Sequence, residues 1–145
     1  GGEWVDAASG RTFEVTNPAR GDVIARVADL SRPEIAQGID AAHAAQKAWA
    51  ARTGKERSRI LHRWFELMVE HQDDLATIMT AEQGKPLAEA KGEVAYGAAY
   101  IEWFAEEAKR VYGETIPGHL PDKHITVIRQ PVGVAASITP WNFPN

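Results

Sequence analysis

The spacing of apolar residues in the first thirty positions predicts a β-hairpin. Two short runs rich in β-branched and aromatic side chains, Thr12–Thr16 and Val23–Ala28, read as strands. The residues between them include three turn formers, Asn17, Pro18 and Gly21. We therefore expect the two strands to be joined by a longer loop rather than by a two-residue turn.

Two helices are predicted next, because the same capping spacing occurs twice. Ser31 is followed three residues later by Glu34, and Thr53 by Glu56, which is the pattern in which a hydroxyl and a carboxylate cap a helix start together. The first helix should end near residue 51. Apolar residues at helical intervals predict a clear buried face on the second helix: Ile60, Leu61, Trp64, Phe65 and Met68.

A short third helix and a long fourth one are separated by a glycine and a proline. Gly84 should end the third helix in a left-handed conformation, and Pro86 suits the first turn of the fourth. We expect residues 87–111 to form the longest helix of the chain. Gly92 and Gly97 lie within it, and each costs about 1 kcal/mol relative to alanine, which indicates close approach by a neighbouring element.

Aromatic side chains repeat along one side of this fourth helix, and they predict burial. The row consists of Tyr96, Tyr100, Trp103 and Phe104. Aromatic residues at helical spacing pack most often in a core. We expect at least one of the last three to be buried against another element.

The C-terminal third of the chain changes to a β-rich pattern. Residues 113–123 hold two glycines and two prolines, so they are expected to be irregular. The runs 124–130 and 132–138 predict two separate strands, because Pro131 between them cannot donate to a ladder. The first strand is expected at an edge or in an arm. The second is largely apolar, which suits a strand covered on both faces.

Composition excludes several classes of protein. The chain has 145 residues, of which 44% are hydrophobic and 25% charged, with a net charge of −4 and no Lys/Arg stripe of the kind that binds nucleic acid. No apolar run approaches the roughly 20 residues that span a bilayer. We therefore expect a soluble cytoplasmic protein that binds neither nucleic acid nor membrane. The chain has no cysteine, which excludes a thiol nucleophile within these residues.

Most of the constellations that could carry chemistry have a plainer explanation. The stretch 82–86, EQGKP, contains Gly and Lys but lacks the second glycine of a phosphate loop, so a helix stop accounts for it. A loop cluster of His119, Asp122 and His124 is explained as solvated surface, since no further strong ligand is at hand, and we assign no metal site.

The last residues, 138–145 (ITPWNFPN), differ because they follow an apolar strand, where α/β sheets bind ligands. Asn142 in this turn could cap a helix. Its amide could also donate a hydrogen bond to a developing oxyanion. The residues by themselves leave both possibilities open.

Taken together, three stretches resemble the aldehyde dehydrogenase superfamily. They are residues 82–118, the strand pair HITVIRQPVGVAASI and the final TPWNFP. The run 82–118 is most similar to the succinate-semialdehyde dehydrogenases of that superfamily. The resemblance extends over essentially the whole chain, starting from the hairpin region GGEWVDAASGRTFEVTNPA.

The resemblance implies an α/β fold, the N-terminal part of the aldehyde dehydrogenase fold, in three segments. Residues 1–115 would form the hairpin and the helices of the cofactor domain. Residues 116–131 would supply a strand segment of the oligomerisation arm. Residues 132–145 would form the first strand of a Rossmann-type sheet and the catalytic turn, and the catalytic domain is absent from this chain. The parent enzyme would be a homo-oligomer, a dimer or a tetramer.

The resemblance also implies roles for individual residues. Asn142 matches the asparagine whose amide helps to hold the thiohemiacetal oxygen. The backbone of four residues would border the nicotinamide of NAD or NADP and its ribose: Ile138, Thr139, Pro140 and Trp141. Tyr96 and Tyr100 fall on the helix that edges the substrate tunnel for a small aldehyde.

These matches predict the N-terminal part of an NAD(P)-dependent enzyme that oxidises succinate semialdehyde or a similar short semialdehyde. Because the family's cysteine nucleophile and general-base glutamate would lie beyond Asn145, we expect the chain to be a fragment that is inactive alone. One alternative is a dehydrogenase for glutarate semialdehyde or another aldehyde. A second is a short, non-catalytic interaction module that pairs through residues 124–130.

Overall fold

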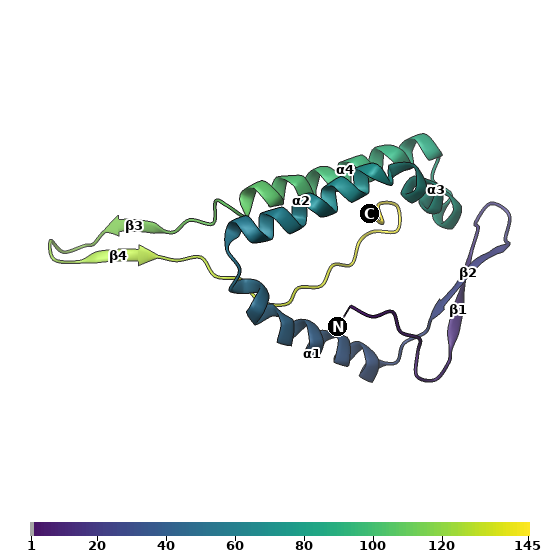
Figure 1. Ribbon diagram of the computed structural model, residues 1–145, viewed down its shortest axis with the longest axis horizontal. Coiled ribbons are helices and arrows are strands. Elements are labelled where there is room, and N and C mark those ends of the chain that lie inside the picture. The colour runs from purple at the N-terminus through teal and green to yellow at the C-terminus, as the bar shows by residue number, and fades with distance from the viewer. Residues whose placement is uncertain (1) are drawn as a thin grey trace.

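The computed structural model describes residues 2–145. Within this range the chain forms four helices and two antiparallel two-stranded sheets, and Figure 1 shows their arrangement. In chain order these elements are β1 (Thr12–Thr16), β2 (Val23–Ala28), α1 (Arg32–Ala50), α2 (Gly54–Glu70), α3 (Gln72–Gln83), α4 (Leu87–Glu107), β3 (Glu114–Pro117) and β4 (His124–Val127).

The N-terminal hairpin, β1 with β2, has the bounds that the sequence predicts. Thr12 pairs with Ala28 at one end of the ladder, and Thr16 pairs with Val23 at the other. Asn17 organises the loop between the strands, since its backbone carbonyl accepts the Gly21 N–H at 2.7 Å and its side chain accepts the Ala19 N–H at 2.9 Å. An asparagine that bonds to the backbone two residues on is typical of such turns.

Helix α1 begins at the predicted capping residues. The Ser31 N–H donates to one carboxylate oxygen of Glu34 at 2.7 Å, and the Ala8 N–H donates to the other oxygen at 2.7 Å. Glu34 thus joins the helix start to the segment before the hairpin. The Ser31 hydroxyl also donates to Glu34. Together the three donors, with the hydroxyl contributing most, lower the pKa of Glu34 to about 2.

Helix α2 repeats the same device without a distant partner. Thr53 accepts the Glu56 N–H at 3.3 Å, and the Thr53 N–H donates to the Glu56 carboxylate at 2.8 Å. Helix α3 then ends as predicted at Gly84, which has a left-handed φ of 80°. The connection to α4 is therefore only three residues long.

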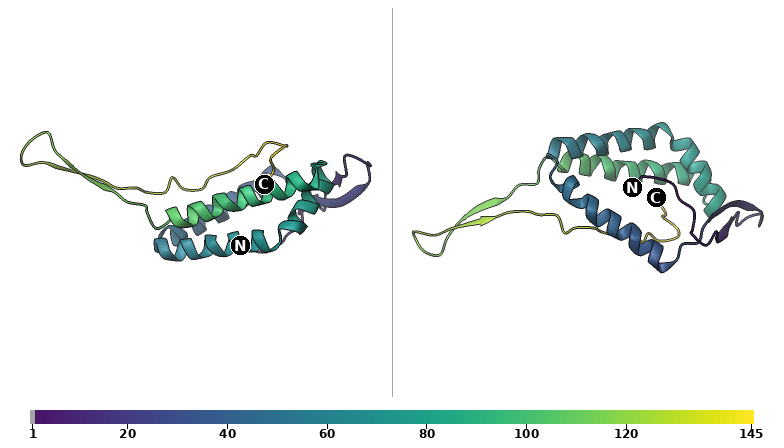
Figure 2. Two further views of the ribbon diagram at one scale, coloured as in Figure 1. Left: turned by 90° about the horizontal axis from the view of Figure 1, so that it is seen from above. Right: turned by 60° about the horizontal axis from the view of Figure 1, so that its bottom comes forward.

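The core lies where α4 packs against both α2 and α3. The right-hand view of Figure 2 shows these three helices side by side, with α1 separate from them. No residue of α1 is buried among the described residues. The core contains mostly small or flexible side chains: Met68, Ala76, Met79, Ala90, Val94 and Ala98, with Phe65, Leu75 and Ile101 packed at its margin. Because the α4 members recur every three or four residues, they form one stripe along the helix.

Helix α4 is the longest helix of the described chain, as predicted, but it ends at Glu107 rather than near residue 111. The predicted aromatic core on this helix is wrong for this chain. Tyr100, Trp103 and Phe104 are all more than half exposed. For Trp103 the reason is geometric, since it lies opposite the stripe of small residues that packs against α2 and α3; Tyr100 leans to the same side, and Phe104, although nearer the stripe, is also left uncovered.

The segment 113–123 is more regular than the sequence indicates. Strand β3 pairs with β4, from Glu114 opposite Val127 to Pro117 opposite His124. Pro117 stands at the end of the ladder, where a missing N–H costs little. The β3–β4 hairpin extends away from the helices in Figure 1, and both strands are exposed.

The second predicted C-terminal strand, residues 132–138, is not formed. No described segment pairs with it, and Val132 and Ile138 are each 97% exposed. An apolar, β-branched sequence favours extended backbone, but a strand also needs a neighbour to hydrogen-bond with. The first run is a strand only over His124–Val127, shorter than the predicted 124–130.

The two glycines of α4 differ in their surroundings. A Cβ on Gly97 would overlap the side-chain amide of Asn145, so the end of the described chain approaches the helix there. A Cβ on Gly92 would meet nothing within 4 Å. The predicted close approach is therefore confirmed at Gly97 and wrong at Gly92.

Replacing Glu34 by Gln should release residue 8 and loosen the start of α1, because one amide group cannot accept all three donors. The folded pKa of about 2 lies below the ordinary 4.5, so the carboxylate's stabilisation is present above pH 4.5 and is lost towards pH 2. The difference in thermal unfolding between variant and original should shrink over this range. The matched control is Glu56→Gln, which should leave amide exchange at residue 8 unchanged; equal exchange in both variants would contradict the long-range link.

Alanine at the two α4 glycines should have opposite effects. Gly92→Ala should stabilise the fold by up to about 1 kcal/mol, since the helix gains propensity and nothing obstructs the methyl group. Gly97→Ala should displace the Asn145 side chain and speed amide exchange in residues 141–145. Thermal unfolding and peptide-level hydrogen exchange measure both effects, and a Gly97→Ala variant with unchanged exchange would refute the contact.

Candidate functional site

The last seven residues form a turn that folds back against the α3–α4 connection. The Phe143 N–H donates to the Pro140 carbonyl at 3.1 Å, which closes the turn. Gln83, the last residue of α3, donates from its side-chain amide to the Trp141 carbonyl at 3.2 Å. The turn is thus attached to the helices by its backbone.

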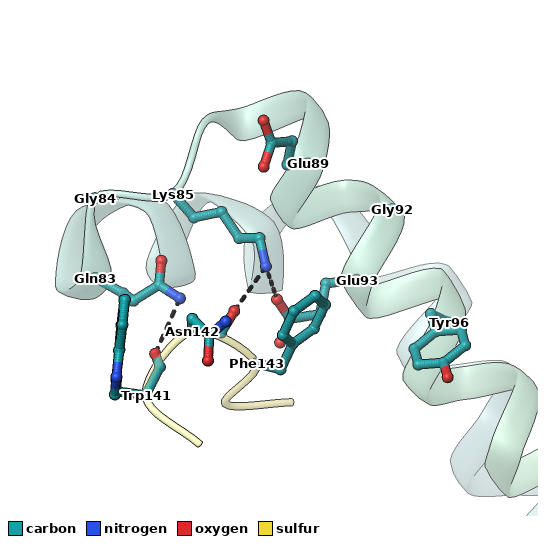
Figure 3. Close-up of a pocket in the computed structure, with 10 residues that line it drawn as sticks. All are labelled: Gln83, Gly84, Lys85, Glu89, Gly92, Glu93, Tyr96, Trp141, Asn142 and Phe143. Atoms are coloured by element: carbon teal, nitrogen blue, oxygen red, sulfur yellow. Dashed lines mark hydrogen bonds and ion pairs between the residues drawn. The ribbon is translucent and has the colours of Figure 1, made fainter. Parts of the chain in front are cut away.

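Lys85 makes the central contact between this turn and the helices (Figure 3). Its ammonium forms an ion pair with Glu93 of α4 and donates to the backbone carbonyl of Asn142 at 2.9 Å. It also lies 4.1 Å from the centre of the Phe143 ring, a cation–π distance. One side chain therefore contacts both α4 and two residues of the turn.

Both members of this ion pair are shielded from solvent. The exposed fraction is 11% for the Lys85 side chain and 2% for the Glu93 side chain. Burying charge is costly unless each ion is paired and hydrogen-bonded. Glu93 meets this condition, since its second oxygen accepts the Asn145 N–H at 3.0 Å. Removing one partner of such a pair typically destabilises a protein by about 3–5 kcal/mol.

An open cleft of about 730 Å³ lies between the turn and α4, a volume typical of ligand sites. Its lining combines apolar surface with a few polar groups: Gln83, Gly84, Lys85, Glu89, Gly92, Glu93, Tyr96, Trp141, Asn142 and Phe143. Gly92 lacks a side chain and so leaves room on the α4 wall. Figure 3 shows these residues around the turn.

Three of the predicted site residues meet in this cleft, namely Tyr96, Trp141 and Asn142. Ile138, Thr139 and Pro140 do not line it, although they lead the chain into the turn. Asn142 caps no helix within residues 2–145. The catalytic role of its amide stays a prediction.

Tyr100 lies outside the cleft, in a neighbouring apolar depression with Trp103 and Phe104. It is linked to the cleft through Tyr96, because the two hydroxyls are 2.9 Å apart and the rings meet edge to face at 5.0 Å. The hydrogen bond with Tyr100 raises the pKa of Tyr96. The two tyrosines therefore act as one polar pair on an otherwise apolar surface.

Sequence reasoning missed Lys85 and Glu93. Gly84 does stop a helix as predicted, but Lys85 beside it has the further task of holding the turn. One signal was present: Glu93 stands three residues after Ala90 and four before Gly97, so a lone carboxylate interrupts a face of small residues. Such a carboxylate requires a buried partner.

Metal clusters and membrane-spanning helices are two further features that would bear on function. Within residues 2–145, no group of three or more His, Cys, Asp or Glu side chains is placed to hold a metal ion. None of the helices in this range is both long enough and apolar enough to cross a membrane.

Comparison with known proteins gives consistent matches. The aldehyde dehydrogenase family matches residues 4–145. A glutarate-semialdehyde dehydrogenase of Pseudomonas putida is 65% identical over 99% of this chain and 30% of its own length. The NADP(+)-dependent succinate-semialdehyde dehydrogenase of Escherichia coli is 62% identical with the same coverage.

Solved structures agree with these sequence matches. The crystal structure of an E. coli NADP-dependent enzyme superposes with a TM-score of 0.95 at 62% identity, covering 99% of this chain and 30% of that one. A Staphylococcus aureus betaine aldehyde dehydrogenase in complex with NAD+ superposes with a TM-score of 0.92 at 31% identity, covering 99% and 29%. The chain spans about 30% of the length of the relatives it matches. With the family matching nearly every described residue, the chain belongs to the aldehyde dehydrogenase family.

Proposed function

We propose that this chain supplies the oxyanion-binding half of the active site in an enzyme that oxidises succinate semialdehyde, or a similar short semialdehyde, to the acid. The observation that carries the proposal is the terminal turn, whose backbone is anchored while Asn142 faces the cleft. The high identity to semialdehyde dehydrogenases supports it.

The role proposed for Asn142 follows from the division between its backbone and its side chain. Lys85 holds the backbone carbonyl, whereas the side-chain amide has no hydrogen-bond partner among residues 2–145. An N–H donor on an anchored backbone, with no other partner, can stabilise negative charge that develops on a carbonyl oxygen.

The segment leading to the turn fits the proposed cofactor, NAD or NADP. Ile138 and Trp141 are 97% and 84% exposed and offer apolar surface to a flat ring. The backbone amides and carbonyls of residues 132–138 have no hydrogen-bond partners in the described chain and are free to bind a ribose or an amide. Such a cofactor, when bound, accepts the hydride that leaves the aldehyde carbon.

The second candidate substrate is glutarate semialdehyde, favoured by the 65% identity to the P. putida enzyme of that name. The relative named for succinate semialdehyde is almost as similar, at 62%. The sequence alternative of a non-catalytic interaction module gains no support, because the relatives named above are dehydrogenases. A homo-oligomeric parent with a β3–β4 arm, a cytoplasmic location and the three-segment division at residues 115 and 131 stay predictions.

A chimeric enzyme tests the proposed function. In it, residues 2–145 replace the matching N-terminal part of the E. coli succinate-semialdehyde dehydrogenase. The chimera should oxidise succinate semialdehyde, and Asn142→Ala should lower its turnover by about 10²–10³ because one oxyanion donor is lost. Cofactor binding, measured by titration, should be largely unchanged. An inactive chimera, or an alanine variant as fast as the original, would refute the proposal.

The 145-residue chain alone should show no aldehyde oxidation with either NAD or NADP. This family of reactions requires a sulfur nucleophile, and the chain has no cysteine. Absorbance of the reduced cofactor measures the rate, with the chimera as the positive control. Turnover by the chain above the background of heat-denatured protein would be the contrary result.

A further inference from the structure

The buried ion pair between Lys85 and Glu93 has no chemical part in the function proposed above. Neither residue is needed to bind an oxyanion or to accept a hydride. Yet the chain places both charges where solvent hardly reaches them, at a typical cost that hydrogen bonds must offset. A reason for keeping them is found in what surrounds the ammonium.

The Lys85 ammonium has three neighbours, and two of them belong to the terminal turn. They are the Glu93 carboxylate, the carbonyl of Asn142 and the ring of Phe143. The geometry points to a positioning role: we propose that Lys85 and Glu93 fix the turn at the position from which the Asn142 amide reaches the reacting oxygen. This inference rests on the proposed function.

Few other hydrogen bonds within residues 2–145 hold the turn in place. The preceding residues, 132–138, pair with no described segment. Besides the ion pair, the turn is hydrogen-bonded to the helices by the exposed contact from Gln83 to the Trp141 carbonyl and by a longer one, 3.4 Å, from the Asn145 side-chain amide to the Glu93 backbone carbonyl. Glu93 also receives the N–H of Asn145, so the pair holds the turn at two points, residues 142 and 145.

The alternative is that the pair only stabilises the short connection between α3 and α4, to which Lys85 belongs. The two roles predict different coupling between residues. A positioning residue acts through Asn142, so its loss should matter little once the Asn142 amide is gone. A residue that only stabilises the fold should affect a variant without that amide as much as it affects the original.

The experiment uses the active chimera defined above. Lys85→Met removes the charge and keeps the apolar stem, and Glu93→Gln keeps the shape and an acceptor for the Asn145 N–H. The control is Lys91→Met. Lys91 lies on α4, as Glu93 does, but its ammonium pairs with Asp73 at 2.8 Å on the exposed surface. Because misplacing a catalytic group by about 1 Å can cost on the order of 10²-fold, we expect Lys85→Met and Glu93→Gln to lower kcat by about 10- to 100-fold. Lys91→Met should stay within about twofold of the original, as exposed pairs contribute little.

Two further measurements separate positioning from general destabilisation. Lys85→Met combined with Asn142→Ala should be no more than about threefold slower than Asn142→Ala alone, as expected for residues that act as one unit. Hydrogen exchange of the peptide 139–145 should accelerate in both single variants and not in Lys91→Met. If Lys85→Met does not assemble, Glu93→Gln, alone and combined with Asn142→Ala, provides the same comparison.

The proposal is overturned if both single variants keep kcat within about twofold, if the losses multiply in the double variant, or if exchange of the turn is unchanged. These outcomes differ from failure of the proposed function. That failure would show as an inactive chimera with the original residues, in which the exchange of peptide 139–145 would still report whether the pair holds the turn.

Discussion

The close packing of α4 against α2 and α3 is the constraint on which the rest of the structure depends. Small side chains at residues 90, 94 and 98 let the three helices approach, and two methionines fill the space between them. Glu93 lies beside this stripe and is buried, with Lys85 and Asn145 as its partners. The helices therefore hold a charge at a fixed depth, and the terminal turn is bound to that charge.

Local signals in the sequence predicted local structure well. The capping pairs at Ser31 and Thr53, the left-handed Gly84 and the first hairpin all depend on residues a few positions apart. Their physics is complete within a short stretch of chain, so the sequence alone contains it. The periodic pattern likewise predicted that α4 exists, whereas its last turn was predicted wrongly because helix ends fray.

Structure that depends on partners was predicted less well. Residues 132–138 have the composition of a strand but no neighbouring strand in the described chain. Phe104 is an aromatic residue of the kind that packs in cores, but it is exposed on α4. Within the site, Asn142 and Trp141 were identified from the resemblance of the turn. Lys85 was not, because a lysine after a helix-ending glycine is ordinary, and its partner is brought to it only when α4 folds back.

The Lys85 contact has a consequence for how this site can change over evolution. The ammonium binds the main-chain oxygen of residue 142, an atom that every amino acid possesses. The location of that residue is therefore independent of its identity. Natural variation can exchange the side chain at 142, and with it the chemistry offered to a ligand, while the scaffold keeps the same point in space. Support and reactivity are encoded by different residues, so the reactive side chain can change without loss of its support.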